Sequence, residues 1–211
     1  MALDMQEQEQ LDAFKAWWKD NGKWVLLVLI ITIGGFAAKQ GWHSYQAKQS
    51  GEASTLYAQL NQQVATKDPK RITDAAAAVV SKYSGSPYAA RAELVAAQAD
   101  IDARDFAAAR TQLQWVIDHA AEDGLKNVAR LKLASVLLDQ QNYAEALKLL
   151  DGPHEEFFNG LYADLKGDVL NAQGKKEEAR ATYQQALART DIKSAYRNLI
   201  QMKLDGLGGA K

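Results

Sequence analysis

The most constraining feature of this sequence is an uncharged stretch near its N-terminus, residues 24–38, which no later segment matches. As an α-helix it would span only ~22 Å, less than the ~30 Å hydrocarbon core of a bilayer, so its flanks must take part. Lysines can extend to the lipid interfaces, and tryptophans favour them. We therefore predict a membrane-spanning helix over residues 23–43. Its expected anchor residues are Lys23, Trp24, Lys39 and Trp42.

A cleaved secretory signal is the alternative for this stretch, because Gly35-Phe36-Ala37 offers small residues at a possible cleavage site. However, signals have a short basic leader, whereas residues 1–22 are long and rich in acid. Trp42, which lies beyond that site, would also have no use as an interfacial residue if the stretch were cleaved off. The sequence therefore favours a retained anchor.

The lysine distribution indicates the orientation. Lys15, Lys19 and Lys23 precede the span, and Lys39 and Lys48 follow it, so the bias favours a cytoplasmic N-terminus, residues 1–22. The larger part, residues 44–211, would then lie in the periplasm of a bacterium. The absence of cysteine is compatible with that oxidising compartment.

Two features of the N-terminal part are suited to contacts. Gly34 with Ala38, and Ala37 with Gly41, form pairs of small residues four positions apart, which permit close packing of a partner helix. Small residues are also common in membrane spans without such a partner. Before the span, residues 8–20 have the pattern of an amphipathic helix, which can contact lipid or dock a protein.

Residues 46–211 carry 21 Lys and Arg against 21 Asp and Glu, mixed along the chain. This balance argues against a nucleic-acid surface, which needs a basic stripe. Alanine is abundant and apolar residues recur at helical spacing, so we predict an all-α fold. Helix breaks are expected at five places rich in glycine or proline. They are 67–69, 84–87, 123–124, 151–153 and 173–175.

Small residues reveal an internal repeat in this region. Two columns of them lie twelve residues apart, and successive units follow at intervals of 37 and 33 residues. Small residues at such positions let the two helices of a hairpin approach closely. This looks like a tetratricopeptide repeat, with the best match over residues 165–187 and the weakest at the first unit, where polar Asp100 replaces a large apolar residue. The six repeat-packing residues are Ala97, Ala109, Ala134, Ala146, Gly167 and Ala179.

Further helices are expected at both ends of this array. Residues 54–64 and 72–83 form a helix pair without a clean motif, which is read as a divergent first unit. A last helix is predicted over residues 191–204, with Asp191 as its N-cap. One face of that helix is expected to cover the end of the stack. The residues of this face are Ala195, Leu199 and Met202.

Residues suited to catalysis are few. The chain has three histidines and no cysteine, and the stretch after His154 lacks the second histidine that a zinc-binding helix needs. We therefore expect no catalytic, metal-binding or cofactor-binding residues. A solenoid of helix hairpins instead presents the side chains of its first helices to a peptide or a folded partner. Candidate exposed residues on those helices are Tyr88, Arg91, Glu93, Arg130, Tyr162, Asp164 and Lys166, of which Tyr88, Arg91, Arg130 and Tyr162 are the predicted partner-binding residues.

The layout resembles that of the ancillary subunits of the SecYEG translocon, the YfgM family. The resemblance rests on the acidic start, the run LDAFKAWWKDNGK at residues 11–23, one membrane helix, the repeats and the ending LIQMKLDGL at residues 199–207. It implies a non-enzymatic, single-pass inner-membrane protein with a cytoplasmic N-terminus and a periplasmic repeat domain. Its implied partners are the SecYEG translocon, a periplasmic chaperone of the PpiD type and secretory client proteins. Its implied role is to link the channel to periplasmic chaperones and to assist the transfer of secreted or outer-membrane proteins.

Two alternatives remain on sequence grounds. A membrane-anchored repeat scaffold or regulator of another envelope complex would share the same anchor and repeats. An enzyme would need a buried cluster of titratable residues in a closed pocket.

Overall fold

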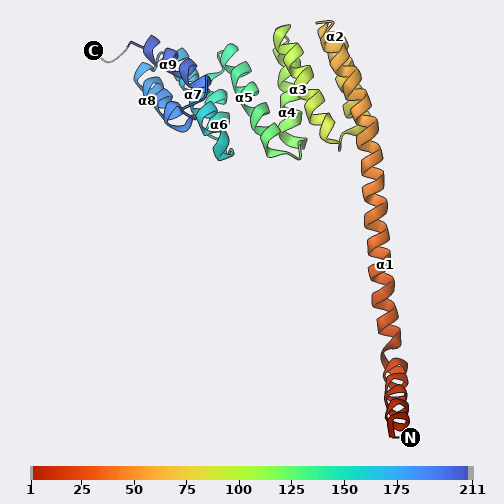
Figure 1. Cartoon of the computed structure of the whole chain (residues 1–211). Coiled ribbons are helices and arrows are strands. Elements are labelled where there is room, and N and C mark those ends of the chain that lie inside the picture. Colours follow the sequence, from red (N-terminus) through yellow and green to blue (C-terminus); the bar gives the residue numbers. More distant parts are fainter. Residues whose placement is uncertain (1, 209–211) are drawn as a thin grey trace. The chain divides into compact units, whose positions relative to one another are not determined.

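The computed structural model describes the backbone of residues 2–208 and the side chains of residues 10, 11 and 13–208. Every regular element among these residues is helical, which confirms the predicted all-α class (Figure 1). The chain forms two compact units, and the boundary between them falls between Gln49 and Ser50. Residues 1 and 209–211, which begin and end the predicted domains, lie outside the described residues.

Helix α1 spans Ala2–Val64 without interruption, so the predicted membrane segment is part of a longer helix. Among the described residues, this is the one helix long and apolar enough to cross a membrane, judged by length and composition. In its uncharged stretch, residues 24–38, the apolar side chains other than the half-buried Val25 are exposed, as Ile30 and Phe36 illustrate with exposed fractions of 71% and 70%. An exposed apolar stretch of this kind needs a nonpolar surrounding such as lipid.

The second unit begins with the end of α1 and continues as consecutive helices. Each helix packs on the next, and α5 also contacts α3 and α7, so the first helices of the successive hairpins are neighbours (Figure 1). These helices are α2 (Pro69–Tyr83), α3 (Pro87–Asp102), α4 (Phe106–His119), α5 (Asp123–Asp139), α6 (Tyr143–Leu150), η1 (Glu156–Phe158), α7 (Asn159–Ala172), α8 (Lys176–Arg189) and α9 (Tyr196–Gly206).

Three hairpin turns repeat the same backbone geometry. Arg104, Gln141 and Gly174 have positive φ angles of 63°, 59° and 77°, and they are spaced by the 37 and 33 residues of the sequence period. In each turn the next residue donates its N–H to a carbonyl five positions back, over 2.8, 2.8 and 3.0 Å. A left-handed residue with this bond is the usual way to end a helix and start another. The three turns are therefore independent support for the repeat.

Four of the five expected breaks lie at turns, but the one at Asp123-Gly124 does not. Asp123 is the first residue of α5, and the chain turns just before it, at residues 120–122. An acidic residue in the first turn of a helix is favoured by the helix dipole, which explains why Asp123 opens the helix.

The small residues of the two columns are buried at the helix contacts. The five alanines have exposed fractions of 0%. At the sixth position, Gly167, an added Cβ would lie 2.5 Å from a ring carbon of Tyr183, so only glycine fits between α7 and α8. Apolar residues of α3 to α7 surround these contacts and form the largest core cluster, which includes Leu113, Val136 and Leu137.

Asp100, which breaks the apolar pattern of the first repeat, is buried and hydrogen-bonded. Asp100 is 7% exposed, and its two carboxylate oxygens accept hydrogen bonds from Gln112 over 2.7 Å and from Thr73 over 3.4 Å. A buried polar group is tolerated when its hydrogen bonds are made inside the protein. Asp100 therefore links α3 to α2 and α4.

The prediction of which face of the last helix covers the stack was wrong. Met202 and Leu199 are 64% and 40% exposed, whereas Ile200 is fully buried against the third repeat. Asp191 accepts from the backbone N–H of Lys193 in a turn before the helix, and α9 itself begins at Tyr196.

Candidate binding groove

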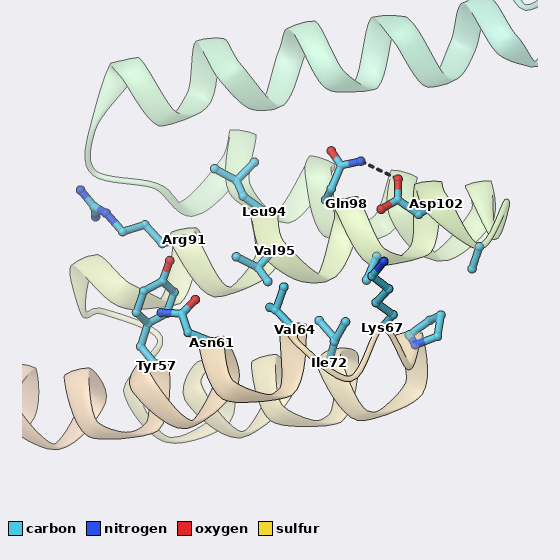
Figure 2. A pocket seen from close by; sticks show the side chains of 13 residues that line it. Tyr57, Asn61, Val64, Lys67, Ile72, Arg91, Leu94, Val95, Gln98 and Asp102 are labelled. Carbon is cyan, nitrogen blue, oxygen red and sulfur yellow. Dashed lines mark hydrogen bonds between the residues drawn. The ribbon is translucent and has the colours of Figure 1, made fainter.

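A groove of about 880 Å³ lies in the second unit between the end of α1, the start of α2 and the length of α3 (Figure 2). Its volume is at the upper end of the range typical of ligand pockets. The lining residues are Tyr57, Asn61, Val64, Lys67, Pro69, Ile72, Arg91, Leu94, Val95, Gln98, Ala99, Asp102 and Ala103.

The middle of the groove is apolar. Figure 2 shows Val95 on α3 pointing toward Val64 and Ile72 on the opposite wall. Val64, the last residue of α1, is 41% exposed. An apolar side chain left open beside a buried cluster offers surface that a ligand can cover.

The turn between α1 and α2 shapes one end of the groove. Lys67 has a φ of 53°, and this left-handed residue reverses the chain between the two helices. Asp68 then caps α2 by accepting the backbone N–H groups of Lys70 and Arg71, and Pro69 occupies the first helical position. These residue types are the ones expected at a helix start, so the sequence itself fixes this wall.

Arg91 lies at the other end of the groove, beside Tyr57 (Figure 2). Its guanidinium donates two hydrogen bonds to the carboxylate of Glu122, of 2.8 and 2.9 Å. These bonds raise the pKa of Arg91 and lower the pKa of Glu122. Arg91 is thus already paired, and its charge is largely neutralised within the chain.

Amide side chains line the groove between these ends. Asn61 makes no side-chain hydrogen bond among the described residues, and Gln98 bonds to Asp102 over 2.8 Å and accepts from Lys132 over 2.5 Å. Free amides can pair with the backbone of a bound chain. The groove therefore combines an apolar floor with groups suited to peptide N–H and C=O groups, an arrangement for binding.

The predicted partner-binding residues occupy two separate places. Tyr88 and Arg91 lie near the groove end, where the rings of Tyr88 and Tyr57 are 5.4 Å apart. Arg130 donates to Asn127 over 3.2 Å and to the carbonyl of Pro153 over 3.4 Å, outside the groove.

Two of the residues expected to be exposed are buried instead. Tyr162 is 2% exposed, and its hydroxyl contacts the side-chain oxygen of Asn127 over 3.3 Å. Burial raises the pKa of this hydroxyl. Asp164 is also 2% exposed and accepts from Tyr196 and Lys203. Both side chains hold helices together, so neither is available to a partner.

The candidate membrane residues all lie on α1. Lys23 and Lys39 are exposed, and Trp24 and Trp42 are each 62% exposed. The four residues of the two predicted small-residue pairs are exposed as well, and at the two glycines among them, Gly34 and Gly41, an added Cβ would meet no atom of the described chain within 4 Å.

Apart from Arg91, the residues that line the groove were not predicted from the sequence. Asn61 and Val64 lie in the last turn of α1 and Val95 lies on α3, and no motif connects them. One signal was present: Lys67-Asp68-Pro69 marked the turn that brings α1 and α2 together. Among the described residues, no group of three or more His, Asp or Glu side chains is placed to hold a metal ion.

Comparison with known proteins then identifies the family. A model of the tetratricopeptide repeat-like domain matches residues 15–209. The ancillary SecYEG translocon subunit of Neisseria gonorrhoeae is 36% identical over 208 residues, which cover 98% of this chain and 100% of that protein. This chain belongs to the family of ancillary SecYEG translocon subunits.

Two further relatives of the family agree with this assignment. The protein of the same name from Aggregatibacter actinomycetemcomitans is 32% identical, and that from Escherichia coli K12 is 30% identical, each over 98% of this chain and at least 99% of the relative. No solved structure matches the chain. The resemblance to this family, which was seen in the sequence, is therefore confirmed. Both the family and the repeat architecture indicate that this chain binds other polypeptides.

Proposed function

We propose that this protein is a non-enzymatic ancillary subunit of the Sec translocon that receives secretory or outer-membrane clients as they emerge and links the channel to a periplasmic chaperone of the PpiD type. The observation that carries this proposal is the open, largely apolar groove of about 880 Å³ in a chain whose relatives are named for the translocon.

The membrane helix supports the proposed location. One N-terminal apolar helix, together with the family, fits a single-pass protein of the inner membrane. In this arrangement residues 1–22 lie in the cytoplasm, residues 23–43 cross the bilayer, and residues 44–211 lie in the periplasm. The lysine bias before the span is the basis for this orientation.

The groove is suited to an extended chain. The lining stretch of α3 from Arg91 to Asp102 is ~17 Å long, enough for about five residues of extended polypeptide. An extended segment leaves its backbone N–H and C=O groups unpaired, whereas a helix satisfies its own. The amide of Asn61, which makes no side-chain hydrogen bond among the described residues, offers partners for such groups, and the apolar floor covers alternate side chains. An unfolded client therefore fits this site better than a folded one.

The connection between span and groove makes weak binding sufficient. Fifteen positions separate Trp42 from Tyr57, so the groove stays within about 54 Å of the membrane anchor whatever the conformation between them. A tether of this length raises the local concentration of the groove beside the channel, which adds avidity without any new contact.

Photo-crosslinking in intact cells tests the proposal. One variant carries a photoreactive residue at Gly34 in the span, and another carries it at Asn61 in the groove. We expect adducts with translocon subunits from the first position and with a pulse-labelled secretory precursor from the second.

A photoreactive residue at Gln114, an exposed position of α4 outside the groove, serves as the matched control. If the span and groove positions label only proteins of another envelope complex, the protein is a scaffold or regulator of that complex, and the proposal is wrong.

A further inference from the structure

Helix α1 carries a cluster of exposed aromatic side chains before the predicted span. The ring centroids of Phe14 and Trp18 are 6.1 Å apart, and that of Trp17 lies 6.3 Å from Phe14 and 6.4 Å from Trp18. At ~100° per residue, these three side chains and Leu11 fall within an arc of about 120° around the helix. The four side chains are 42–58% exposed and form one apolar surface, the aromatic face.

The aromatic face lies close to the predicted span along the chain, yet beyond the reach of lipid if α1 stands upright in the bilayer. Phe14 precedes Trp24, the first residue of the uncharged stretch, by ten positions, which is ~15 Å along a helix axis. The polar interface of a bilayer is only about 5–8 Å thick on each side. An upright α1 would therefore leave most of the aromatic face in water, which is unfavourable for so many large apolar side chains.

The helix has a weak point between the aromatic face and the span. Asn21-Gly22 is a pair typical of turns, and glycine in a helix interior lowers the stability of that helix. The side chain of Asn21 donates to the carbonyl of Trp17 over 3.1 Å, and such local bonds compete with the helical backbone. Helix α1 is continuous through this point, so the bend that these residues permit is a response to the bilayer surface.

The charges around the aromatic face have both signs. Three lysines and two aspartates fall within residues 10–23, and three further carboxylates precede them. These charged residues are Lys15, Lys19, Lys23, Asp12, Asp20, Asp4, Glu7 and Glu9. Such a mixture gives no attraction to anionic headgroups, which polybasic segments bind. Contact with lipid must therefore come from the apolar side chains.

We propose that α1 bends at Asn21-Gly22 and that the aromatic face lies in the boundary between headgroups and acyl chains, in the leaflet on the N-terminal side of the span. The occupant of this face is phospholipid. Tryptophan and phenylalanine favour this boundary, and an amphipathic helix buries its apolar side there. Lipid is the partner within reach, because the same helix enters that leaflet a few residues later. The inference goes beyond the proposed function, since it needs the span but no particular ligand of the groove.

Two labelling positions distinguish a bent helix from an upright one. The chain has no cysteine, so a single introduced cysteine can carry a nitroxide in the full-length protein. Gln10→Cys falls within the arc of the aromatic face without replacing one of its residues, and Ala16→Cys falls on the opposite side. In an upright helix, residue 10 lies ~21 Å and residue 16 ~12 Å before Trp24, so residue 16 is nearer to lipid. In the proposed arrangement residue 10 contacts lipid and residue 16 faces water.

Electron paramagnetic resonance on the labelled protein in nanodiscs of phosphatidylethanolamine and phosphatidylglycerol tests the inference. The measured quantity is the ratio of nitroxide collisions with oxygen, which concentrates in lipid, to collisions with a water-soluble nickel chelate. We expect a higher ratio at residue 10 than at residue 16. Phe14→Ser combined with Trp18→Ser should abolish this difference by lowering the ratio at residue 10. Ala13→Ser combined with Ala16→Ser, outside the aromatic face, is the matched control and should leave the ratio at residue 10 unchanged.

Three results would overturn the inference. A ratio at residue 10 equal to or below that at residue 16 would show that the segment stands away from the bilayer. Few collisions with either reagent at residue 10 would show that a polypeptide, such as a second copy of this chain, covers the aromatic face. The ratio at residue 10 should also persist in nanodiscs of phosphatidylcholine alone, and its loss there would show that charge, not the apolar face, binds the lipid.

Discussion

Substitution of Lys203 is expected to release α9 from the end of the repeat stack. The ammonium group of Lys203 lies 2.7 Å from a carboxylate oxygen of Asp164 and 2.7 Å from one of Asp168. Asp164 is 2% exposed, so without Lys203 its charge would remain buried, with the hydroxyl of Tyr196 as its remaining partner. Lys203→Met keeps the apolar stem and removes the charge.

Two limits bound the size of this effect. Removal of one partner from a buried ion pair costs about 3–5 kcal/mol. However, α9 can detach and let water reach Asp164. The loss of stability then cannot exceed the free energy with which α9 packs on the repeat stack. Its one fully buried side chain is Ile200, whose burial stabilises by about 1.5–3 kcal/mol. We therefore expect a loss of about 2–3 kcal/mol in the free energy of α9 opening.

Hydrogen exchange measured by mass spectrometry on the full-length protein in mild detergent reads this opening directly. A loss of about 2.8 kcal/mol corresponds to about 100-fold faster exchange in α9. Amides of α5, in the middle of the stack, should keep their wild-type rates. The double variant Lys203→Met with Asp164→Asn should recover most of the protection, because it leaves no buried charge.

Lys193→Met is the matched control, since Lys193 is exposed on the loop before α9 and lies in no ion pair of the described chain. If Lys203→Met speeds exchange in α9 by less than threefold, or no more than the control does, the ion pairs do not hold this helix and the reasoning is refuted.

Three further predictions concern the repeat domain. Gly167→Leu should lower its unfolding free energy by about 3 kcal/mol in urea titrations followed by circular dichroism, because the side chain would overlap the Tyr183 ring. Gly124→Leu is the control: an added Cβ there would lie 3.9 Å from a carboxylate oxygen of Glu155, an ordinary contact, so the change should be less than about 0.5 kcal/mol. Burial and hydrogen bonds to carboxylates raise the pKa of Tyr183 and Tyr196, so above pH 10 the unfolded state loses these protons before the folded state does. The unfolding free energy should therefore fall by about 1.4 kcal/mol per pH unit for each group. Replacing either tyrosine with phenylalanine should make this fall with pH less steep, and an unchanged slope would contradict the prediction. Asp68→Ala should lower the stability of α2 by about 1 kcal/mol, because it removes the N-cap of that helix. Hydrogen exchange of the amides in the first turn of α2 should then be about fivefold faster, and exchange rates equal to those of the wild type would exclude the capping role.

The features set by local chemistry were predictable from the sequence. The apolar N-terminal helix, the helical class and four of the five breaks follow from runs of apolar residues and from glycine and proline positions. The repeat was also visible, because close helix contacts require small residues at fixed spacing. The turns at Arg104 and Gln141 follow the same period although neither residue is glycine, which shows that the hairpin geometry overrides local preference there.

Features that depend on contacts between helices were not predictable. On α9, Leu199 and Met202 form as good an apolar stripe as Ile200 and Leu204, and only the carboxylates of α7 select the second face by binding Lys203. Tyr162 looked like a surface residue for the same reason, because its hydroxyl is satisfied by a residue 35 positions away. The groove arises from three elements that no single segment describes.

We propose above that the groove between α1 and α3 holds extended client chains. The most direct measurement is the affinity of the full-length protein in nanodiscs for a fluorescent, unfolded segment of a secretory precursor. Val64→Lys places a charge on the exposed apolar wall of the groove, and Gln114→Lys places the same charge on α4 outside it. We expect binding at least about tenfold weaker for Val64→Lys and unchanged for Gln114→Lys. Equal affinities of both variants and the wild type would show that the groove does not hold the client.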